Sequence, residues 1–161
     1  MSWLCFQNNF FFRLKEALED FDKALLLDDK NPIIYSNIGL VWRKLENFEK
    51  AIESYTKELQ YSKENHKTFN NRAYCYAKLG KYRDAVDDYT KALSIDPRNM
   101  HALHNRGICY ERLGLYRNVK FFERKNILTL FHKAIEDFTS VISLNKNNAN
   151  AYFNRGCCYD K

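Results

Sequence analysis

One spacing recurs in several different classes of residue along this chain. Two rows of small residues and two rows of aromatic residues each repeat at intervals of 34, 34 and 49 positions. The rows are Gly39, Ala73, Gly107 and Gly156; Trp42, Tyr76, Tyr110 and Tyr159; Ala17, Ala51, Ala85 and Ala134; and Phe21, Tyr55, Tyr89 and Phe138. Different residue classes rarely share one period by chance, so the chain is predicted to consist of repeated structural units.

The residue types in these rows indicate paired helices. Small residues such as Gly39 let two helices approach closely, and large ones such as Trp42 fill the space between them. The Asn31-Pro32 pair is typical of a helix start, and Gly80 and Gly114 are predicted to end helices. A lone helical hairpin cannot bury its apolar face, so the hairpins are predicted to stack. With only five Gly and two Pro, the chain favours long helices over a turn-rich β fold.

These residues resemble the tetratricopeptide repeat, with the clearest match in residues 69–99, FNNRAYCYAKLGKYRDAVDDYTKALSIDPRN. The resemblance covers residues 13–161 apart from one insertion, and it implies an all-α, right-handed solenoid of stacked antiparallel helix pairs. Departures are few: Glu58 stands where the family prefers Ala, and Lys63 and Lys146 stand where it prefers Pro.

A single solenoid of four to five units is therefore expected over residues 1–161. Residues 1–12 are expected to form a degenerate first helix and 13–31 the second helix of unit 1. Units 2, 3 and 4 follow at 32–65, 66–99 and 100–148, and residues 149–161 form the first helix of a truncated unit 5. Because that helix has no second or capping helix after it, the sequence is expected to be a fragment of a longer array.

An insertion accounts for the long interval in unit 4. Removing residues 118–132, NVKFFERKNILTLFH, restores the 34-residue register, and Ile127, Leu128 and Phe131 are spaced to continue the face of Ile135 and Phe138. Three explanations are open: a loop with a helical extension, an intron translated through mistaken gene modelling, and a functional docking insert. In each case the extra residues are expected to leave the hairpin at its exposed turn.

The resemblance implies that the first helices line a concave groove that binds a protein or peptide. Candidate groove residues are Asn37, Lys44, Lys67, Asn71, Lys78, His101, Asn105 and Arg112. The basic side chains among them would favour an acidic peptide. Arg72, Arg106 and Arg155 form a further row of basic residues at the repeat spacing, which would add to such a groove. The alternative is that Lys44, Lys78 and Arg112 only offset helix dipoles, and that the asparagines join neighbouring helices.

One subclass of the family holds the carboxylate tail of heat-shock chaperones with two Lys, two Asn and one Arg. Lys67 and the asparagine row match part of this clamp, but Ser36, Leu40 and Asn105 stand at the places of a Lys, an Asn and the Arg. An intact clamp is therefore not expected.

No motif for catalysis, a cofactor or a metal site is evident. His101 and His104 lie three residues apart without a third ligand, and Cys75, Cys109 and Cys158 share one repeat position where small residues pack. The chain is therefore predicted to be a non-catalytic interaction scaffold without cofactor, metal or small-molecule substrate.

Charge, hydropathy and cysteine usage bear on partners and location. The net charge of +6 is spread without a basic block, so nucleic acid is not the expected partner. No apolar run is long enough for a membrane span, the N-terminus lacks a signal peptide, and the cysteines suit a reducing compartment, so a cytoplasmic location is expected. Two rivals are an RNA-binding helical repeat, suggested by the pI of about 9.0, and the repeat portion of a multidomain enzyme or co-chaperone.

Overall fold

The computed structural model describes residues 3–115 and 124–161, and within them the secondary structure is entirely helical. Eight helices are described in these two ranges. They are α1 (Trp3–Leu27), α2 (Pro32–Lys44), α3 (Phe48–Tyr61), α4 (His66–Lys78), α5 (Tyr82–Ile95), α6 (Met100–Leu115), α7 (Arg124–Leu144) and α8 (Ala149–Tyr159).

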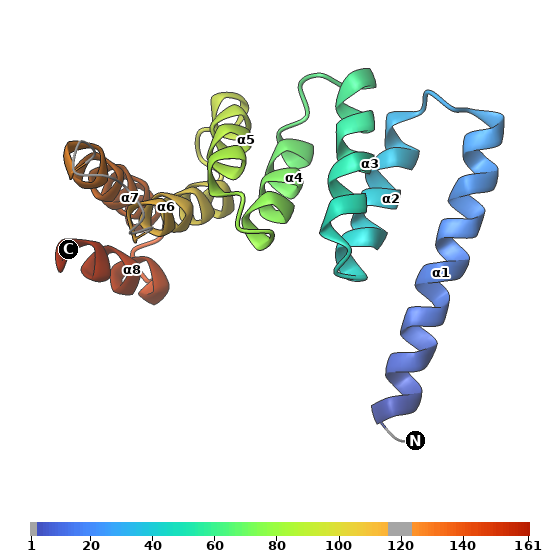
Figure 1. The fold of residues 1–161 in the computed structure, drawn as a ribbon, viewed down its shortest axis with the longest axis horizontal. Helices are drawn as coiled ribbons and strands as arrows, with labels where there is room; N and C mark the ends of the chain where they lie inside the picture. The colour runs from blue at the N-terminus through green and yellow to red at the C-terminus, as the bar shows by residue number, and fades with distance from the viewer. Residues whose placement is uncertain (1–2, 116–123) are drawn as a thin grey trace.

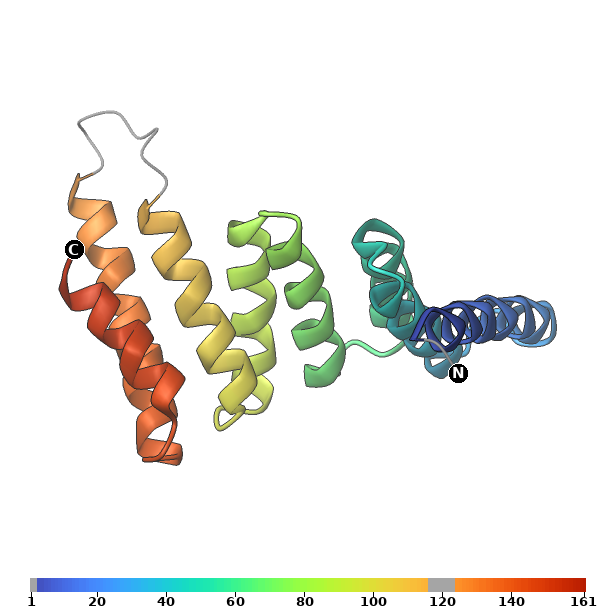
Figure 2. The same cartoon turned by 90° about the horizontal axis from the view of Figure 1, so that it is seen from below.

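Consecutive helices lie side by side in one elongated row (Figure 1). Helices α2 and α3, α4 and α5, and α6 and α7 pair as antiparallel hairpins, with α1 at one end of the row and α8 at the other (Figure 2). Each helix packs mainly on its neighbours in sequence. The predicted all-α solenoid of stacked helix pairs is confirmed.

Asparagine side chains begin most of the helices. Asn31, Asn47 and Asn65 accept hydrogen bonds from backbone N–H groups in the first turns of α2, α3 and α4 at 3.0–3.1 Å. Asn99 and Asn148 do the same for α6 and α8 at 3.1 and 3.0 Å. Such caps satisfy backbone donors that a helix leaves unpaired. Four of them follow the intervals of 34, 34 and 49 residues, so this row belongs to the repeat too.

The predicted small and aromatic rows pack against each other inside the hairpins. Tyr55 and Phe138 are fully buried. A Cβ atom added at Gly39 would lie 2.6 Å from the ring of Tyr55, and one added at Gly107 would lie 2.9 Å from the ring of Phe138. Paired helices therefore approach more closely than any larger residue at positions 39 and 107 would allow.

Glu58, one of the three departures from the family pattern, is buried and hydrogen-bonded to nearby side chains. Its carboxylate accepts hydrogen bonds from the Asn65 side chain at 2.9 Å and from the Thr68 hydroxyl at 2.5 Å. Glu58 thus ties α3 to the start of α4. Both hydrogen bonds reach Oε1, whereas Oε2 is buried without a partner among the described residues, so they offset only part of the cost of burying the carboxylate.

The N-terminal segment differs from the prediction. Residues 1–12 were expected as a degenerate first helix and 13–31 as a separate second helix, but α1 runs without interruption from Trp3 to Leu27. The first 27 residues contain neither Gly nor Pro, so no residue there breaks the helix. Unit 1 therefore has no hairpin within the described residues.

Both helices of unit 4 are longer than their counterparts in units 2 and 3. Residues 118–123 lie outside the described residues, and 124–132 form the first turns of α7, in agreement with a helical extension. Gly114, predicted to end a helix, instead lies inside α6, and a Cβ atom there would meet the ring of Phe131 at 2.9 Å. Phe131, counted as inserted, is buried in the core, whereas Leu128 is exposed.

Across residues 3–115 and 124–161, no helix is both long and apolar enough to cross a membrane.

Candidate functional site

The eight predicted groove residues lie on three successive first helices, α2, α4 and α6. Five are exposed, namely Lys44, Lys67, Lys78, His101 and Arg112, and three are half-buried, namely Asn37, Asn71 and Asn105. Exposure leaves the five cationic or titratable side chains available to a ligand.

Two of the predicted lysines border one open hollow between α2 and α4. Its volume is about 460 Å³, and we call it the basic hollow. It is lined by Arg43, Lys44, Glu46, Phe48, Tyr74 and Lys78. The other predicted groove residues do not line it. Three cations and one carboxylate therefore surround two aromatic rings.

The ring of Tyr74 lies next to three other residues that line the basic hollow. The Arg43 guanidinium carbon lies 5.6 Å from the ring centroid, and Lys78 Nζ lies 5.3 Å from it. Phe48 packs edge-on against the same ring, with centroids 6.4 Å apart. Cations at these distances are attracted to the ring face. The ring therefore places two positive charges beside one flat surface.

Asn71 takes part in this arrangement through a neighbouring helix. Its side-chain oxygen accepts a hydrogen bond from Arg43 Nη1 at 3.3 Å, which joins α4 to α2. For Asn71, the helix-to-helix alternative considered for the asparagine row is the one present in this structure. Sequence reasoning missed Arg43 and Tyr74, although Arg43 immediately precedes a predicted residue.

The second arginine row serves packing between helices. Arg72 forms a bidentate ion pair with Asp88, in which Nε and Nη2 donate to the two carboxylate oxygens at 2.7 and 2.9 Å. Arg106 forms the same bidentate pair with Asp137 at 2.9 and 2.8 Å. Both carboxylates are buried. Each arginine also donates to a threonine of the preceding second helix, Thr56 or Thr90. The interpretation of Arg72 and Arg106 as ligand-binding cations is wrong, because their charges are already matched.

The histidine pair divides into one exposed and one packed residue. His101 is exposed, whereas His104 is half-buried and packs edge-on against Phe138, with ring centroids 5.6 Å apart. Burial lowers the pKa of His104, and the neighbouring His101 lowers it further. In the part of the chain that the structure describes, no cluster of three or more potential ligands could hold a metal ion.

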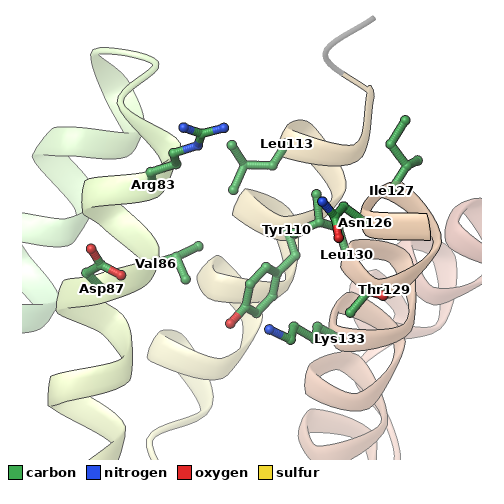
Figure 3. A pocket seen from close by; sticks show the side chains of 10 residues that line it. All are labelled: Arg83, Val86, Asp87, Tyr110, Leu113, Asn126, Ile127, Thr129, Leu130 and Lys133. Atoms are coloured by element: carbon green, nitrogen blue, oxygen red, sulfur yellow. The ribbon is translucent and has the colours of Figure 1, made fainter. Parts of the chain in front are cut away.

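A second hollow, also of about 460 Å³, lies between α5 and α7 over α6 (Figure 3). Tyr110 of α6 and Lys133 of α7 lie side by side there, with Lys133 Nζ 5.6 Å from the ring centroid. Four lining residues, Asn126, Ile127, Thr129 and Leu130, come from the insertion. In the sequence analysis, only one explanation of residues 118–132, a functional docking insert, suggested a binding surface in this region.

The repeated cysteines lie in the core, as predicted. Cys75, Cys109 and Cys158 are buried and free. Burial raises the pKa of the Cys75 thiol to about 11 and that of Cys109 to about 12. Such thiols stay protonated at neutral pH and are poor nucleophiles.

Comparison with protein families gives three matches, each described as a tetratricopeptide repeat. They cover residues 33–65, 66–99 and 88–118. A search of curated protein sequences finds no significant match.

Solved structures with the same fold are numerous. The Arabidopsis OM64 TPR domain is 23% identical with a TM-score of 0.68, over 80% of this chain and 94% of that one. A crystal structure of MamA is 18% identical with a TM-score of 0.81, over 96% of this chain and 76% of that one. The second TPR domain of human RPAP3, in complex with the HSP70 peptide SGPTIEEVD, is 25% identical with a TM-score of 0.64, over 81% of this chain and all of that one.

Proposed function

The chain belongs to the tetratricopeptide repeat family, and we propose that it is a non-catalytic scaffold that binds an acidic peptide segment of a partner protein. The observation that carries this proposal is the basic hollow, where Arg43 and Lys78 lie beside the ring of Tyr74 and Lys44 adds a third cation to the lining.

The chemistry of the basic hollow suits a carboxylate next to an apolar group. Arg43 and Lys78 offer N–H donors to carboxylate oxygens, and the exposed part of the Tyr74 ring offers a flat surface to an aliphatic side chain. Glu46 at the rim would repel a carboxylate placed directly beside it, so the ligand is expected to lie on the Lys44 and Lys78 side.

The fold supports binding by a preformed surface. The basic hollow lies between two hairpins whose helices are fixed by Asn caps and buried aromatic contacts, so little ordering is required when a peptide binds. The related RPAP3 domain holds a peptide ending in two glutamates, a valine and an aspartate, which makes an acidic peptide a reasonable class of ligand here.

We also propose that other predicted groove residues contribute to the binding surface outside the basic hollow. Asn37, Lys67, His101, Asn105 and Arg112 lie on the same three first helices and are proposed to contact an extended ligand beyond the basic hollow. The free thiols Cys75 and Cys109 support a reducing compartment, and we propose the cytoplasm.

Fluorescence anisotropy with labelled SGPTIEEVD as the acidic probe tests this function. We expect binding that weakens as salt is added, because exposed charges are screened. Replacing Lys44 and Lys78 by Glu should weaken binding by about tenfold or more, since each reversal changes attraction worth up to about 1 kcal/mol into repulsion.

Lys81→Glu provides the matched control. Lys81 is exposed and only three residues from Lys78, but it does not line the basic hollow. We expect it to leave the affinity within about twofold. If Lys81→Glu lost as much affinity as the variant with Glu at positions 44 and 78, or if the unmodified chain did not bind the acidic probe, the proposal would be contradicted. Salt-sensitive retention of RNA in a gel shift would favour the nucleic-acid alternative instead.

A further inference from the structure

The second hollow is separate from the surface proposed to bind an acidic peptide. It lies between two second helices, α5 and α7, whereas the basic hollow lies between two first helices, α2 and α4. The two hollows share no lining residue, and no predicted groove residue lines the second one. Its volume of about 460 Å³ is in the size range of protein sites that hold ligands. A ligand bound there would therefore contact different residues from one bound in the basic hollow.

The apolar part of the second hollow comes from three helices. Val86 of α5, Leu113 of α6 and Leu130 of α7 are half-buried and line it. Each helix contributes residues three or four positions apart, such as Leu130 and Lys133, so each presents one stripe of side chains to the hollow (Figure 3). Helices pack on one another through such stripes, and an apolar groove between helices commonly receives a partner helix. The shape of the second hollow therefore suits a helix.

The insertion supplies one wall of the second hollow. The wall lies in the first turns of α7 and consists of Asn126, Ile127, Thr129 and Leu130. Because removing residues 118–132 restores the 34-residue register, these four residues have no counterparts in units 2 and 3. This wall therefore belongs to unit 4 alone.

Two other lining residues reverse the charge of their repeat counterparts. Arg83 stands 34 residues after Glu49, and Lys133 stands 49 residues after Asp84. The matching place between units 2 and 3 thus has a carboxylate at both positions where the second hollow has a cation. The reversal occurs in the same place as the wall that the insertion adds.

The rest of the lining keeps its chemical type between the two places. Ile52, Glu53, Tyr76 and Leu79 of units 2 and 3 correspond to Val86, Asp87, Tyr110 and Leu113. The place between units 2 and 3 therefore has three carboxylates, whereas the second hollow has two cations and one carboxylate. Only the second hollow favours a partner with negative charge.

The two cations of the second hollow are free to pair with a partner. Arg83 and Lys133 are both exposed, and neither forms an ion pair within residues 3–115 and 124–161. They come from opposite walls, α5 and α7, with the apolar residues between them (Figure 3). Arg83 extends toward Leu113 and away from Asp87, so the carboxylate of Asp87 does not occupy the space in front of it (Figure 3).

We propose that the second hollow binds an acidic amphipathic helix of a partner protein. Aliphatic residues one turn apart on that helix contact Leu113 and Leu130, and carboxylates on its two sides pair with Arg83 and Lys133. Residues 126–130 then act as a docking insert, one of the three explanations left open for the insertion.

Fluorescence anisotropy with two labelled helical peptides tests this inference. Both are alanine-based and about 18 residues long, since shorter peptides are marginally helical. They carry the same stripe of leucines, flanked by glutamates in the acidic helical probe and by lysines in the basic one. We expect the acidic helical probe to bind the unmodified chain. Arg83→Glu combined with Lys133→Glu should weaken its binding by about tenfold or more, and should make the basic probe bind more tightly than it binds the unmodified chain.

Lys81→Glu combined with Lys146→Glu is the matched control. Both lysines are exposed, neither lines the second hollow, and the net charge changes by the same amount. Affinity for the acidic helical probe should stay within about twofold. An equal loss in this control would overturn the proposal, because it would show attraction to the overall charge of the chain.

The apolar contact and the helical form of the ligand have their own tests. Leu130→Ser should weaken binding by about fivefold or more, since a leucine contact is lost. Leu128→Ser is its control, because Leu128 is 57% exposed and does not line the second hollow. A proline at the centre of the acidic helical probe breaks its helix and should abolish binding. If the proline-containing probe bound equally well, the ligand would be an extended peptide and the proposal would be wrong.

The two proposed sites can be tested independently. The variant with Glu at positions 44 and 78 should bind the acidic helical probe within about twofold of the unmodified chain, because the second hollow is intact in it. The variant with Glu at positions 83 and 133 should likewise keep its affinity for SGPTIEEVD. Failure of the acidic helical probe to bind the variant with Glu at positions 44 and 78 would overturn the second site and leave the result for the basic hollow unaffected.

Discussion

Gly39 of α2 lies so close to Tyr55 of α3 that a Cβ atom at position 39 would meet Cε1 of the ring at 2.6 Å. The ring is fully buried and has no space to retreat. Gly39→Ala is therefore expected to lower the free energy of unfolding by about 1–3 kcal/mol, although alanine favours a helix by roughly 1 kcal/mol. Urea unfolding followed by circular dichroism measures the change.

Gly156→Ala is the control for this substitution. It occupies the same repeat position but meets no atom within 4 Å, so it is expected to raise the free energy of unfolding by up to about 1 kcal/mol. If both alanine variants stabilised the protein, the close helix approach at Gly39 would be wrong.

The turn between α2 and α3 holds Glu46 with a φ of 57°, and the matching turn of the next unit holds Gly80 with a φ of 72°. This conformation costs an L-residue about 1–2 kcal/mol, and glycine loses about 0.5–1 kcal/mol more on folding. Glu46→Gly is thus expected to raise the free energy of unfolding by up to about 1 kcal/mol. Gly80→Ala should lower it, and the opposite order in chemical denaturation would contradict this account.

Much of the fold could be predicted because the contacts within a hairpin recur at a fixed spacing. Gly39, Tyr55 and Cys75 each repeat in other units, so their burial follows from the period alone. The continuity of α1 could not be predicted from the repeat, because residues 1–12 lack the landmarks and only the absence of Gly and Pro indicates one helix.

The candidate site was predicted less completely, because it depends on contacts between units. Lys44 and Lys78 were predicted as groove residues, but the aromatic ring beside Arg43 and Lys78 was not. It belongs to Tyr74, and the matching positions of units 2, 4 and 5 hold no aromatic residue. The arginine row was misinterpreted because its aspartates lie on second helices, 16 or 31 residues away.

The buried ion pair of Arg106 and Asp137 is expected to be important for stability. Asp137→Ala leaves a mostly buried guanidinium without its carboxylate, so the free energy of unfolding should fall by about 3–5 kcal/mol. Replacing both residues by apolar ones, Arg106→Met with Asp137→Leu, should recover most of this loss. Thermal and urea unfolding of the single and double variants provide the measurement.

Glu136→Ala serves as the control for that pair. Glu136 is exposed beside Asp137, and its removal should change the free energy of unfolding by less than about 0.5 kcal/mol. A double variant no more stable than Asp137→Ala alone would show that the pair contributes by its charges rather than by filling space.

The buried thiols predict how stability responds to alkaline pH. Burial raises the pKa of Cys75 from 9.0 to about 11 and that of Cys109 from 9.0 to about 12. A raised pKa in the folded state means that the unfolded chain loses its proton first. The stabilising contribution is therefore complete below pH 9 and is lost as the pH rises through 11 to 12. At a pH of about 10 the loss should be roughly 1 kcal/mol for each thiol. Urea unfolding at pH values of about 8 and about 10 measures it, and Cys109→Ala should show a smaller difference between the two than the unmodified chain. Equal differences would mean that the Cys109 thiolate is not excluded from the core.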